Sequence, residues 1–192
     1  MRVDIWSDYI CPWCYLGTEV GEWLEHEKGC QVVWHPFELH PEIPVGRRAL
    51  IKRNGRGHMA ELLRQAGLPY KAPTRAANSH AALEVGELAR AQNVFPEWHR
   101  RAFRAHFVHG LDISDEEVLR GVGEEAGLDP DDVSDVLCRG LYAETVDRSR
   151  EKAIDHGVSG APAFLFDRRF VVPGVQRRDL FVRIIEKLSA MQ

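Results

Sequence analysis

Two cysteines near the start of the chain stand where a strand pattern gives way to a helix pattern. Residues 2–7 (RVDIWS) place apolar side chains on one side of an extended segment, which suits a strand. From Pro12 onward apolar side chains recur at helical spacing, and residues 31–39 read as a second strand. A strand, a helix and a strand in this order form a βαβ unit, so Cys11 and Cys14 are predicted to open its helix.

The end of the chain has a different order of elements. Residues 161–166 and 168–174 read as two short strands joined by a tight turn, and residues 177–188 read as a helix with one apolar side. Residues 40–156 begin with a stretch rich in proline and glycine. That stretch contains one short helix near residues 58–67, and helical patterns dominate after it.

These patterns predict an α/β chain with a thioredoxin-like fold, in which βαβ and ββα parts are separated by a large helical insertion. We assign residues 1–39 and 157–192 to the thioredoxin-like domain. Residues 40–156 form the insertion, including the helix that leads back into that domain. Three helix starts are predicted from capping residues, namely Asn78, the capping box of Ser114 and Glu117, and Asp129 before Pro130.

Composition excludes several classes of protein. The chain has 192 residues, 44% of them hydrophobic, and a formal net charge of -4, so no overall basic field attracts nucleic acid. No apolar run approaches the roughly 18 residues that a membrane span needs, and the first residues lack the pattern of a signal peptide. Four cysteines are too few for a disulfide scaffold. We therefore predict a cytoplasmic protein, in which a disulfide is transient and catalytic rather than structural.

The spacing of the two cysteines suits thiol–disulfide exchange. Side chains three residues apart in the first turn of a helix lie on the same face, so their sulfurs can bond without moving the backbone. The unpaired N–H groups and partial positive charge of a helix start favour a thiolate. We therefore predict that Cys11 is exposed and acts as the nucleophile, and that Cys14, one turn inward, resolves the mixed disulfide. Pro12 removes an N–H group where little is lost, and Trp13 shapes access to the pair.

Pro162 is the second candidate site residue. It stands in VSGAPAF, directly before a predicted strand, at a position where thioredoxin-like folds carry a cis proline that faces the cysteine pair. A cis bond before proline costs only about 0.5–1 kcal/mol. We predict that the Ala161–Pro162 bond is cis and that Ala161 and Pro162 shape the substrate groove. A trans proline in an ordinary loop is the alternative.

Five segments together resemble the DsbA-like thioredoxin family: SDYICPWCYLG, PFELHPEIP, NSHAAL, FRAHFVHGLDISDEEVL and GVSGAPAFLF. They span nearly the whole chain in the family's order and look most similar to the cytoplasmic FrnE-type oxidoreductases. The resemblance implies a thioredoxin domain with a helical insertion and dithiol–disulfide exchange at Cys11 and Cys14. Periplasmic members carry histidine where this chain has Trp13, so their strongly oxidising character is not expected here.

The resemblance leaves a second enzyme class open. The same superfamily contains 2-hydroxychromene-2-carboxylate isomerases and kappa-class glutathione transferases, which resemble one another in placing serine where this chain has Cys11. The presence of both cysteines favours exchange over that chemistry. We expect no resident cofactor and no metal, and partners that are proteins or small molecules with thiols or disulfides. Glutathione is a candidate co-substrate. No nucleic-acid or membrane partner is expected.

Two further interpretations of the cysteine pair were considered. A zinc ribbon needs a second pair, and although Cys30 follows at a suitable distance, Val33 stands where its partner is required. A non-catalytic peptide binder could instead use the aromatic residues near the pair, of which at least half are expected in the core. These residues are Trp6, Tyr9, Trp13 and Tyr15.

Some residues have more than one reading. Cys30 and Cys138 are predicted to be small buried hydrophobic side chains. His80 either moves protons near the cysteines or is structural. The basic segment 46–58 either collects an anionic substrate or is a solvated loop. Its charged residues are Arg47, Arg48, Lys52, Arg53 and Arg56.

Overall fold

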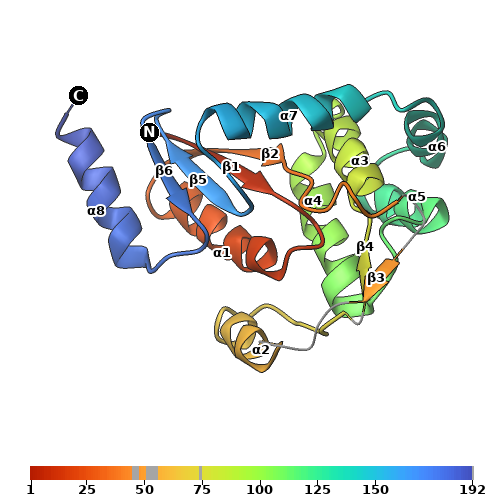
Figure 1. The fold of residues 1–192 in the computed structure, drawn as a ribbon, viewed down its shortest axis with the longest axis horizontal. Helices are drawn as coiled ribbons and strands as arrows, with labels where there is room; N and C mark the ends of the chain where they lie inside the picture. Colours follow the sequence, from red (N-terminus) through yellow and green to blue (C-terminus); the bar gives the residue numbers. More distant parts are fainter. Residues whose placement is uncertain (45–47, 51–55, 74, 192) are drawn as a thin grey trace.

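A four-stranded sheet joins the two ends of the chain. The computed structural model describes residues 1–44, 48–50, 56–73 and 75–191. The strands are β1 (Arg2–Ser7), β2 (Gln31–Pro36), β5 (Ala163–Phe166) and β6 (Phe170–Pro173). Their order across the sheet is β2-β1-β5-β6, with β1 parallel to β2 and antiparallel to β5 (Figure 1). The predicted βαβ and ββα parts therefore meet along β1 and β5, as the sequence patterns indicated.

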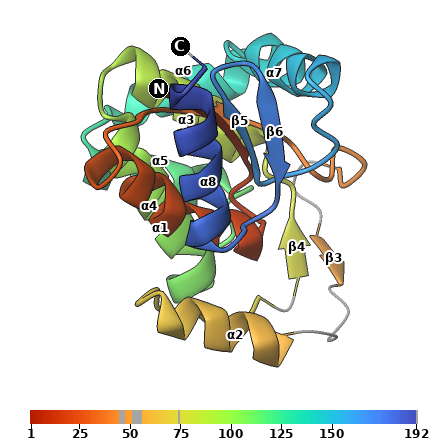
Figure 2. The same cartoon turned by 90° about the vertical axis from the view of Figure 1, so that its left-hand side faces the viewer.

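Helices cover both faces of this sheet because side chains alternate along each strand. Val3 and Ile5 of β1 point into a core that α1 (Pro12–His26) and α8 (Arg178–Ser189) complete. Trp6 belongs to a smaller cluster on the opposite face, which includes residues of α7 (Ala143–Asp155) and of β5. Figures 1 and 2 show α8 and α7 on opposite sides of the sheet.

The middle of the chain is mostly helical. Its elements are β3 (Arg48–Leu50), α2 (Arg56–Gln65), β4 (Arg75–Ala77), α3 (His80–Ala91), α4 (Phe95–Arg104), the π-helical turn η1 (Ala105–His109), α5 (Glu116–Ala126) and α6 (Pro130–Arg139). Fully buried Trp98, Phe103 and Phe107 form its centre, and the cluster they belong to continues into Cys14 and Tyr15 of α1. The start of α1 is therefore packed against this helical part.

Several details differ from the sequence predictions. The second strand ends at Pro36 instead of residue 39, because proline has no N–H group for the ladder. The short antiparallel pair β3 and β4 and the π-helical turn were not predicted. Figure 2 shows α2 at one edge of the molecule, next to this pair. None of the described helices combines the length and apolar character needed to cross a membrane.

One of the three predicted helix caps is wrong, and a second lies one residue before the N-cap position. Asp115, not Ser114, caps α5, and its side chain accepts hydrogen bonds from Glu117 N and Val118 N. A carboxylate in that position displaces the Ser114 hydroxyl, which donates to Asp112 instead. At the start of α3 the N-cap position is Ser79, whose side chain makes no capping bond. Asn78 supplies that bond instead, because its Oδ1 accepts from His80 N at 3.0 Å.

The third predicted cap is confirmed, and the end of α7 also has a favourable local arrangement. Asp129 caps α6 in front of Pro130, and its side chain accepts a hydrogen bond from Asp131 N. His156 stands at the end of α7, and Gly157 follows with a positive φ of 78°. Both ends therefore follow from local residue chemistry, since a carboxylate satisfies a free N–H group and glycine tolerates the left-handed conformation.

Gly21 fixes how closely α1 packs on the sheet. A methyl group at this position would overlap the ring of Trp34 and approach the Ile5 side chain to 3.4 Å. We expect Gly21→Ala to lower the free energy of unfolding by about 1–3 kcal/mol, as overpacking does. Gly121 in α5 meets no heavy atom within 4 Å, so Gly121→Ala should raise it by roughly 0.5–1 kcal/mol. Urea unfolding of both variants checks this, and equal effects would contradict the packing argument.

Candidate active site

The turn between β1 and α1 places the cysteine pair. Cys11 is the N-cap residue of α1, and Pro12 stands at the first helical position. The Cys11 N–H group donates to Asp8 O at 3.1 Å, and the Cys11 carbonyl accepts from Tyr15 N at 3.0 Å. Both bonds hold the backbone of Cys11 where the free N–H groups of the first helical turn gather.

The two thiols lie in contact but differ in exposure. Both are free, and they are close enough that Cys11 acts on the pKa of Cys14. Cys14 is fully buried, whereas Cys11 retains 7% of its surface. The prediction that Cys11 is exposed is therefore wrong in degree, because Cys11 packs into the same core cluster as Cys14. Burial, and then the neighbouring Cys11, raise the pKa of Cys14 well above its ordinary value.

The loop before β5 closes over Cys11 from the other end of the chain. The Ala161–Pro162 bond is cis, so this prediction is confirmed. The Cys11 thiol donates to the Ala161 carbonyl at 3.6 Å, and the Pro162 carbonyl accepts from Gly174 N at 2.8 Å. Two segments that are 150 residues apart in sequence thus meet at one sulfur atom.

A cavity of about 680 Å³ lies beside this loop. Its walls include three of the predicted substrate-binding residues, namely Trp13, Ala161 and Pro162, together with Leu39 and Val175. The Trp13 side chain is 40% exposed, so an apolar surface borders the approach to the cysteine pair. Pro12, the fourth predicted residue, lies at the start of α1 between Cys11 and Trp13 rather than in the cavity wall.

Asp8 is a site residue that the sequence analysis missed. Its side chain is fully buried, and its carboxylate accepts hydrogen bonds from Ile10 N at 3.2 Å and Leu39 N at 2.8 Å. Its own N–H group contacts the sulfur of Cys14 at 3.4 Å. Burial raises the pKa of Asp8 to about 6, despite the two backbone donors. The available signal was an acidic residue directly after a buried strand and three positions before the first cysteine.

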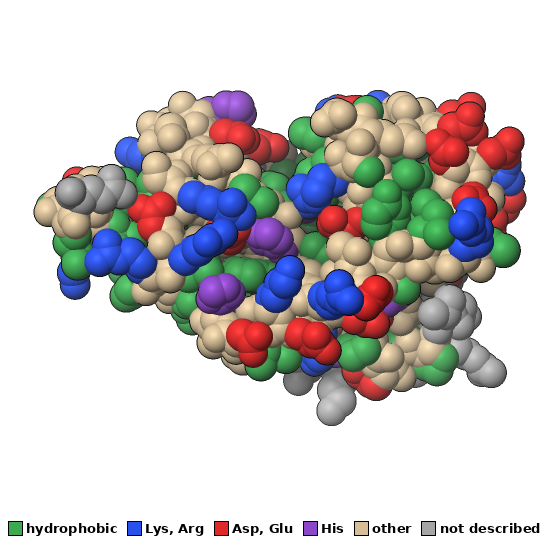
Figure 3. Space-filling view, turned by 90° about the horizontal axis from the view of Figure 1, so that it is seen from above, with side chains coloured by type: hydrophobic (Ala, Val, Ile, Leu, Met, Phe, Trp, Pro, Cys, Tyr) green, Lys and Arg blue, Asp and Glu red, His purple; other side chains and the backbone are tan. Residues whose placement is uncertain are grey.

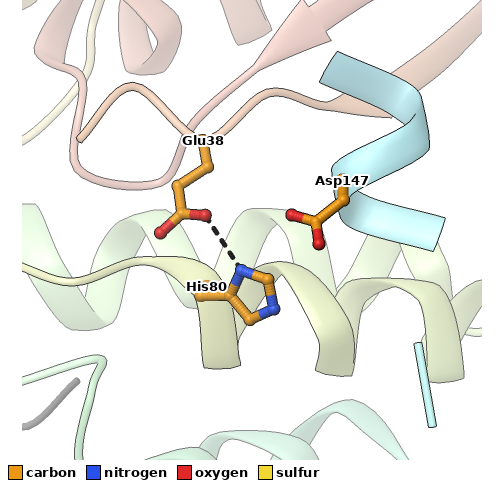
Figure 4. A group of neighbouring side chains, drawn as sticks. All are labelled: Glu38, His80 and Asp147. Carbon is orange, nitrogen blue, oxygen red and sulfur yellow. Dashed lines mark hydrogen bonds and ion pairs between the residues drawn. The ribbon is translucent and has the colours of Figure 1, made fainter. Parts of the chain in front are cut away.

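A polar network next to Asp8 explains Asn78 and His80. The Asn78 amide donates to Glu38 Oε1 at 3.0 Å and to the Ile43 carbonyl at 2.8 Å. The other oxygen of Glu38 pairs with His80 Nδ1 at 2.9 Å, and this hydrogen bond raises the pKa of His80 (Figure 4). Asn78 Oδ1 also accepts from His80 N at 3.0 Å, so Asn78 both ties the segment after β2 to the start of α3 and satisfies the first N–H group of that helix.

Among the described residues, this network also contains the one group that could hold a metal ion. Ligand atoms of Glu38, His80 and Asp147 lie within 4.8 Å of one another. The hydrogen bond between Glu38 and His80 accounts for their approach, and Asp147 is an exposed residue of α7 that points toward them (Figure 4). The cysteine pair takes no part in this group.

The remaining candidate residues lie away from the site, or their side chains are not described by the structure. Cys30 is buried as predicted, but Cys138 is exposed on α6, so that prediction is wrong. Its helix buries only Val133 and Val136, on the opposite side. In the basic segment, Arg47, Lys52 and Arg53 lie outside the described residues, and Arg48 and Arg56 are described only as the first residues of β3 and α2. Of the four aromatic residues near the pair, only Trp13 is exposed, which agrees with the expectation that most are core.

The chain belongs to the DSBA-like thioredoxin domain family, whose model matches residues 2–186. The fold places it with solved members of that class. It superposes on a probable DsbA oxidoreductase from Streptomyces coelicolor with a TM-score of 0.88 and 27% identity, covering 100% of this chain and 91% of the other. The expected thioredoxin-like fold with its helical part is thereby confirmed.

Two similar sequences and a further solved structure also match the chain over most of its length. YwbO of Bacillus subtilis, described as uncharacterized, is 25% identical over 193 residues and covers 96% of each chain. A 2-hydroxychromene-2-carboxylate isomerase of Sphingobium xenophagum is 26% identical over 175 residues, covering 86% of this chain and 88% of its own. A cytosolic disulfide reductase, DsbM of Pseudomonas aeruginosa with GSH, shares the fold at a TM-score of 0.73 and 20% identity, covering 99% of this chain and all of the other.

The raised pKa of Asp8 gives a pH dependence of stability. An unfolded aspartate has a pKa near 3.8, so the folded state binds a proton at Asp8 more tightly than the unfolded state does. The stabilisation that this proton gives to the folded state is lost as the pH rises from about 4 to about 6. We expect the free energy of unfolding of the wild type, relative to Asp8→Asn, to fall by about 3 kcal/mol over that range. Asp155→Asn, an exposed change on α7, is the control and should leave the slope unchanged. Parallel curves for wild type and Asp8→Asn in urea unfolding would contradict the burial argument.

Proposed function

We propose that the protein is a thiol–disulfide oxidoreductase in which Cys11 is the nucleophile and Cys14 the resolving thiol. The Cys11 thiolate attacks a substrate disulfide, whose S–S bond breaks while a Cys11–substrate disulfide forms and one substrate thiolate leaves. Cys14 then loses its proton and attacks the Cys11 sulfur, which forms the 11–14 disulfide and releases the second substrate thiolate. The substrate gains two electrons and the protein loses two. The same steps in reverse oxidise a dithiol.

The observation that carries this proposal is the proximity of two free thiols of unequal burial at the start of α1. Only Cys11 retains accessible surface, so an incoming disulfide reaches Cys11 first. Cys14 lies one helical turn further on in the same core cluster, so the second attack needs little rearrangement. Cys11 is the N-cap residue of α1, where the N–H groups of the first helical turn have no partner within the helix.

Asp8 supports the proton transfer that the second step needs. Burial keeps Cys14 protonated, and a buried thiol cannot attack until it loses that proton. Asp8 is the buried carboxylate whose charge acts on Cys14, and its pKa of about 6 allows it to accept a proton near neutral pH. We assign Asp8 the role of proton acceptor for Cys14.

The cavity beside Pro162 is the proposed substrate groove. Trp13, Ala161 and Pro162 line it, and the Ala161 carbonyl already accepts a bond from the Cys11 thiol. A substrate backbone that replaces this bond would bring its disulfide against Cys11. Glutathione is the proposed co-substrate that returns the pair to its starting state. The cytoplasm is the proposed location, since glutathione keeps thiols reduced there.

Glutathione-dependent isomerisation is the second candidate function, because of the similarity to the isomerase of Sphingobium xenophagum. In that chemistry the protein activates the thiol of glutathione and needs no second cysteine. The buried contact between Cys11 and Cys14 favours disulfide exchange, since an isomerase has no use for a resolving thiol.

Reduction of insulin in the presence of dithiothreitol tests the proposal. We expect Cys11→Ser to fall to the uncatalysed rate, because it removes the only accessible thiol of the pair. Cys14→Ser should lose about tenfold or more, because its mixed disulfide is not resolved internally. Cys138→Ser removes an exposed thiol elsewhere and should retain full activity. Full activity of Cys11→Ser would contradict the proposal.

A second assay separates the two candidate functions. The wild type and Cys14→Ser are each given glutathione and 2-hydroxychromene-2-carboxylate. The proposal expects no turnover by either protein. Isomerisation that survives the loss of Cys14 would overturn disulfide exchange in favour of the isomerase chemistry.

A further inference from the structure

A second cavity lies along β1 and β2, between these strands and the helices α3 and α7. It has a volume of about 620 Å³ and is lined by residues of β1, β2, β5, α3, α7 and the turn between β5 and β6. No residue lines both this cavity and the one beside Pro162. Figure 3 shows Lys, Arg and His side chains gathered around a hollow in the middle of this face. We call it the basic cleft.

The acidic side chains of the basic cleft are already neutralised. Asp4 accepts hydrogen bonds from Arg2 Nη2 at 2.6 Å and from His35 Nε2 at 2.7 Å. Glu87 pairs with Arg90 at 3.3 Å. These two carboxylates therefore offer little attraction to a cation in the cleft, and they do not offset its other basic groups.

Two basic side chains of the cleft have no acidic partner within the part of the chain that the structure describes. Lys152 comes from α7 and Arg168 from the turn between β5 and β6, so they approach from different elements. Arg148 of α7 also lines the cleft, and its partner Glu144 lies outside the lining. The field inside the cleft is therefore positive.

Two buried polar groups in the wall also lack partners among the described residues. Trp6 and Ser149 both line the cleft, and neither the indole N–H group nor the hydroxyl makes a hydrogen bond. Trp6 is 4% exposed and Ser149 9%. The Trp6 ring lies between His35, at a centroid distance of 5.2 Å, and His156, at 6.1 Å. A buried polar group without a partner is unfavourable, so an acceptor oxygen that reached either group would stabilise the wall.

The turn that carries Arg168 is held in a costly conformation. Asp167 and Arg168 have φ values of 45° and 56°, a left-handed region that glycine adopts far more readily than other residues. Asp167 Oδ1 accepts a hydrogen bond from Arg2 N at 2.7 Å, which fixes the turn against the first strand. A ligand contact made by the Arg168 side chain in the cleft would explain why arginine, and not glycine, occupies this left-handed position.

From these features we infer that the basic cleft binds a small phosphate-bearing anion, with Lys152 and Arg168 as its principal charged contacts. Guanidinium and ammonium groups are the usual partners of phosphate oxygens, and they act most strongly where no carboxylate competes. The volume lies within the range of about 300–1,000 Å³ that is typical of small-molecule sites. The site is separate from the cysteine pair, so its occupancy does not depend on the proposed exchange reaction.

Calorimetric titration of the full chain with inorganic pyrophosphate tests this inference. We expect saturable binding to the wild type, at least tenfold weaker binding to the double variant Lys152→Ala, Arg168→Ala, and weaker binding at higher salt. The control double variant Arg183→Ala, Lys187→Ala removes two exposed charges from α8 and should bind as the wild type does. Citrate, a carboxylate anion of similar charge, should bind more weakly than pyrophosphate.

Three outcomes would overturn the inference. They are no saturable binding by the wild type, an equal loss in the control variant, and tighter binding of citrate. A measurement on the unmodified chain guards against misfolding of the variants. The indole N–H signal of Trp6, assigned with Trp6→Phe, should shift in NMR spectra as pyrophosphate is added, and an unmoved signal would contradict the assignment to this cleft.

Discussion

The buried contact between Cys14 and the turn that precedes α1 is the interaction on which the site depends. Asp8 contributes its carbonyl to Cys11 N, its N–H group to the sulfur of Cys14 and its carboxylate to Leu39 N. One residue therefore positions both cysteines and holds the segment after β2 against them. Since Cys14 has no exposed surface, any chemistry of the pair with a large substrate has to begin at Cys11.

The fold brings the other half of the site from the end of the chain. β5 pairs with β1 in antiparallel register, Trp6 opposite Ala163, so the residues just before β5 lie beside the turn that follows β1. This register delivers the Ala161 carbonyl to Cys11. The helical part packs against Tyr15 and Cys14 through Phe103 and Phe107, which closes the inner side of the pair to water. A substrate can therefore approach the cysteine pair from the side bordered by Trp13 and Pro162.

Much of this arrangement could be predicted because it is encoded in local patterns. The strand, the cysteine spacing and the proline before β5 each lie within a few consecutive residues, and their order implies the βαβ and ββα parts. The role of Asp8 could not be predicted because it depends on burial by Leu39 and the helical part. A single acidic residue in the sequence does not show that it will be buried. Asn78 was predicted as a cap, and its side chain does accept from His80 N. Its bonds to Glu38 and Ile43 could not be predicted, since those residues come from another segment. The exposure of Cys11 was overestimated because Cys11 packs into the same core cluster as Cys14, and that cluster is built from segments far apart in the sequence.

The most direct test of the account is to trap the first covalent intermediate. Cys14→Ser is incubated with glutathione disulfide, and the intact mass and peptide map are then measured. The account predicts one glutathionyl group on Cys11, no adduct on Cys14 in the matching Cys11→Ser variant, and an internal 11–14 disulfide without adduct in the wild type. Rapid modification of Cys14 in the Cys11→Ser variant would contradict the order of attack that burial imposes.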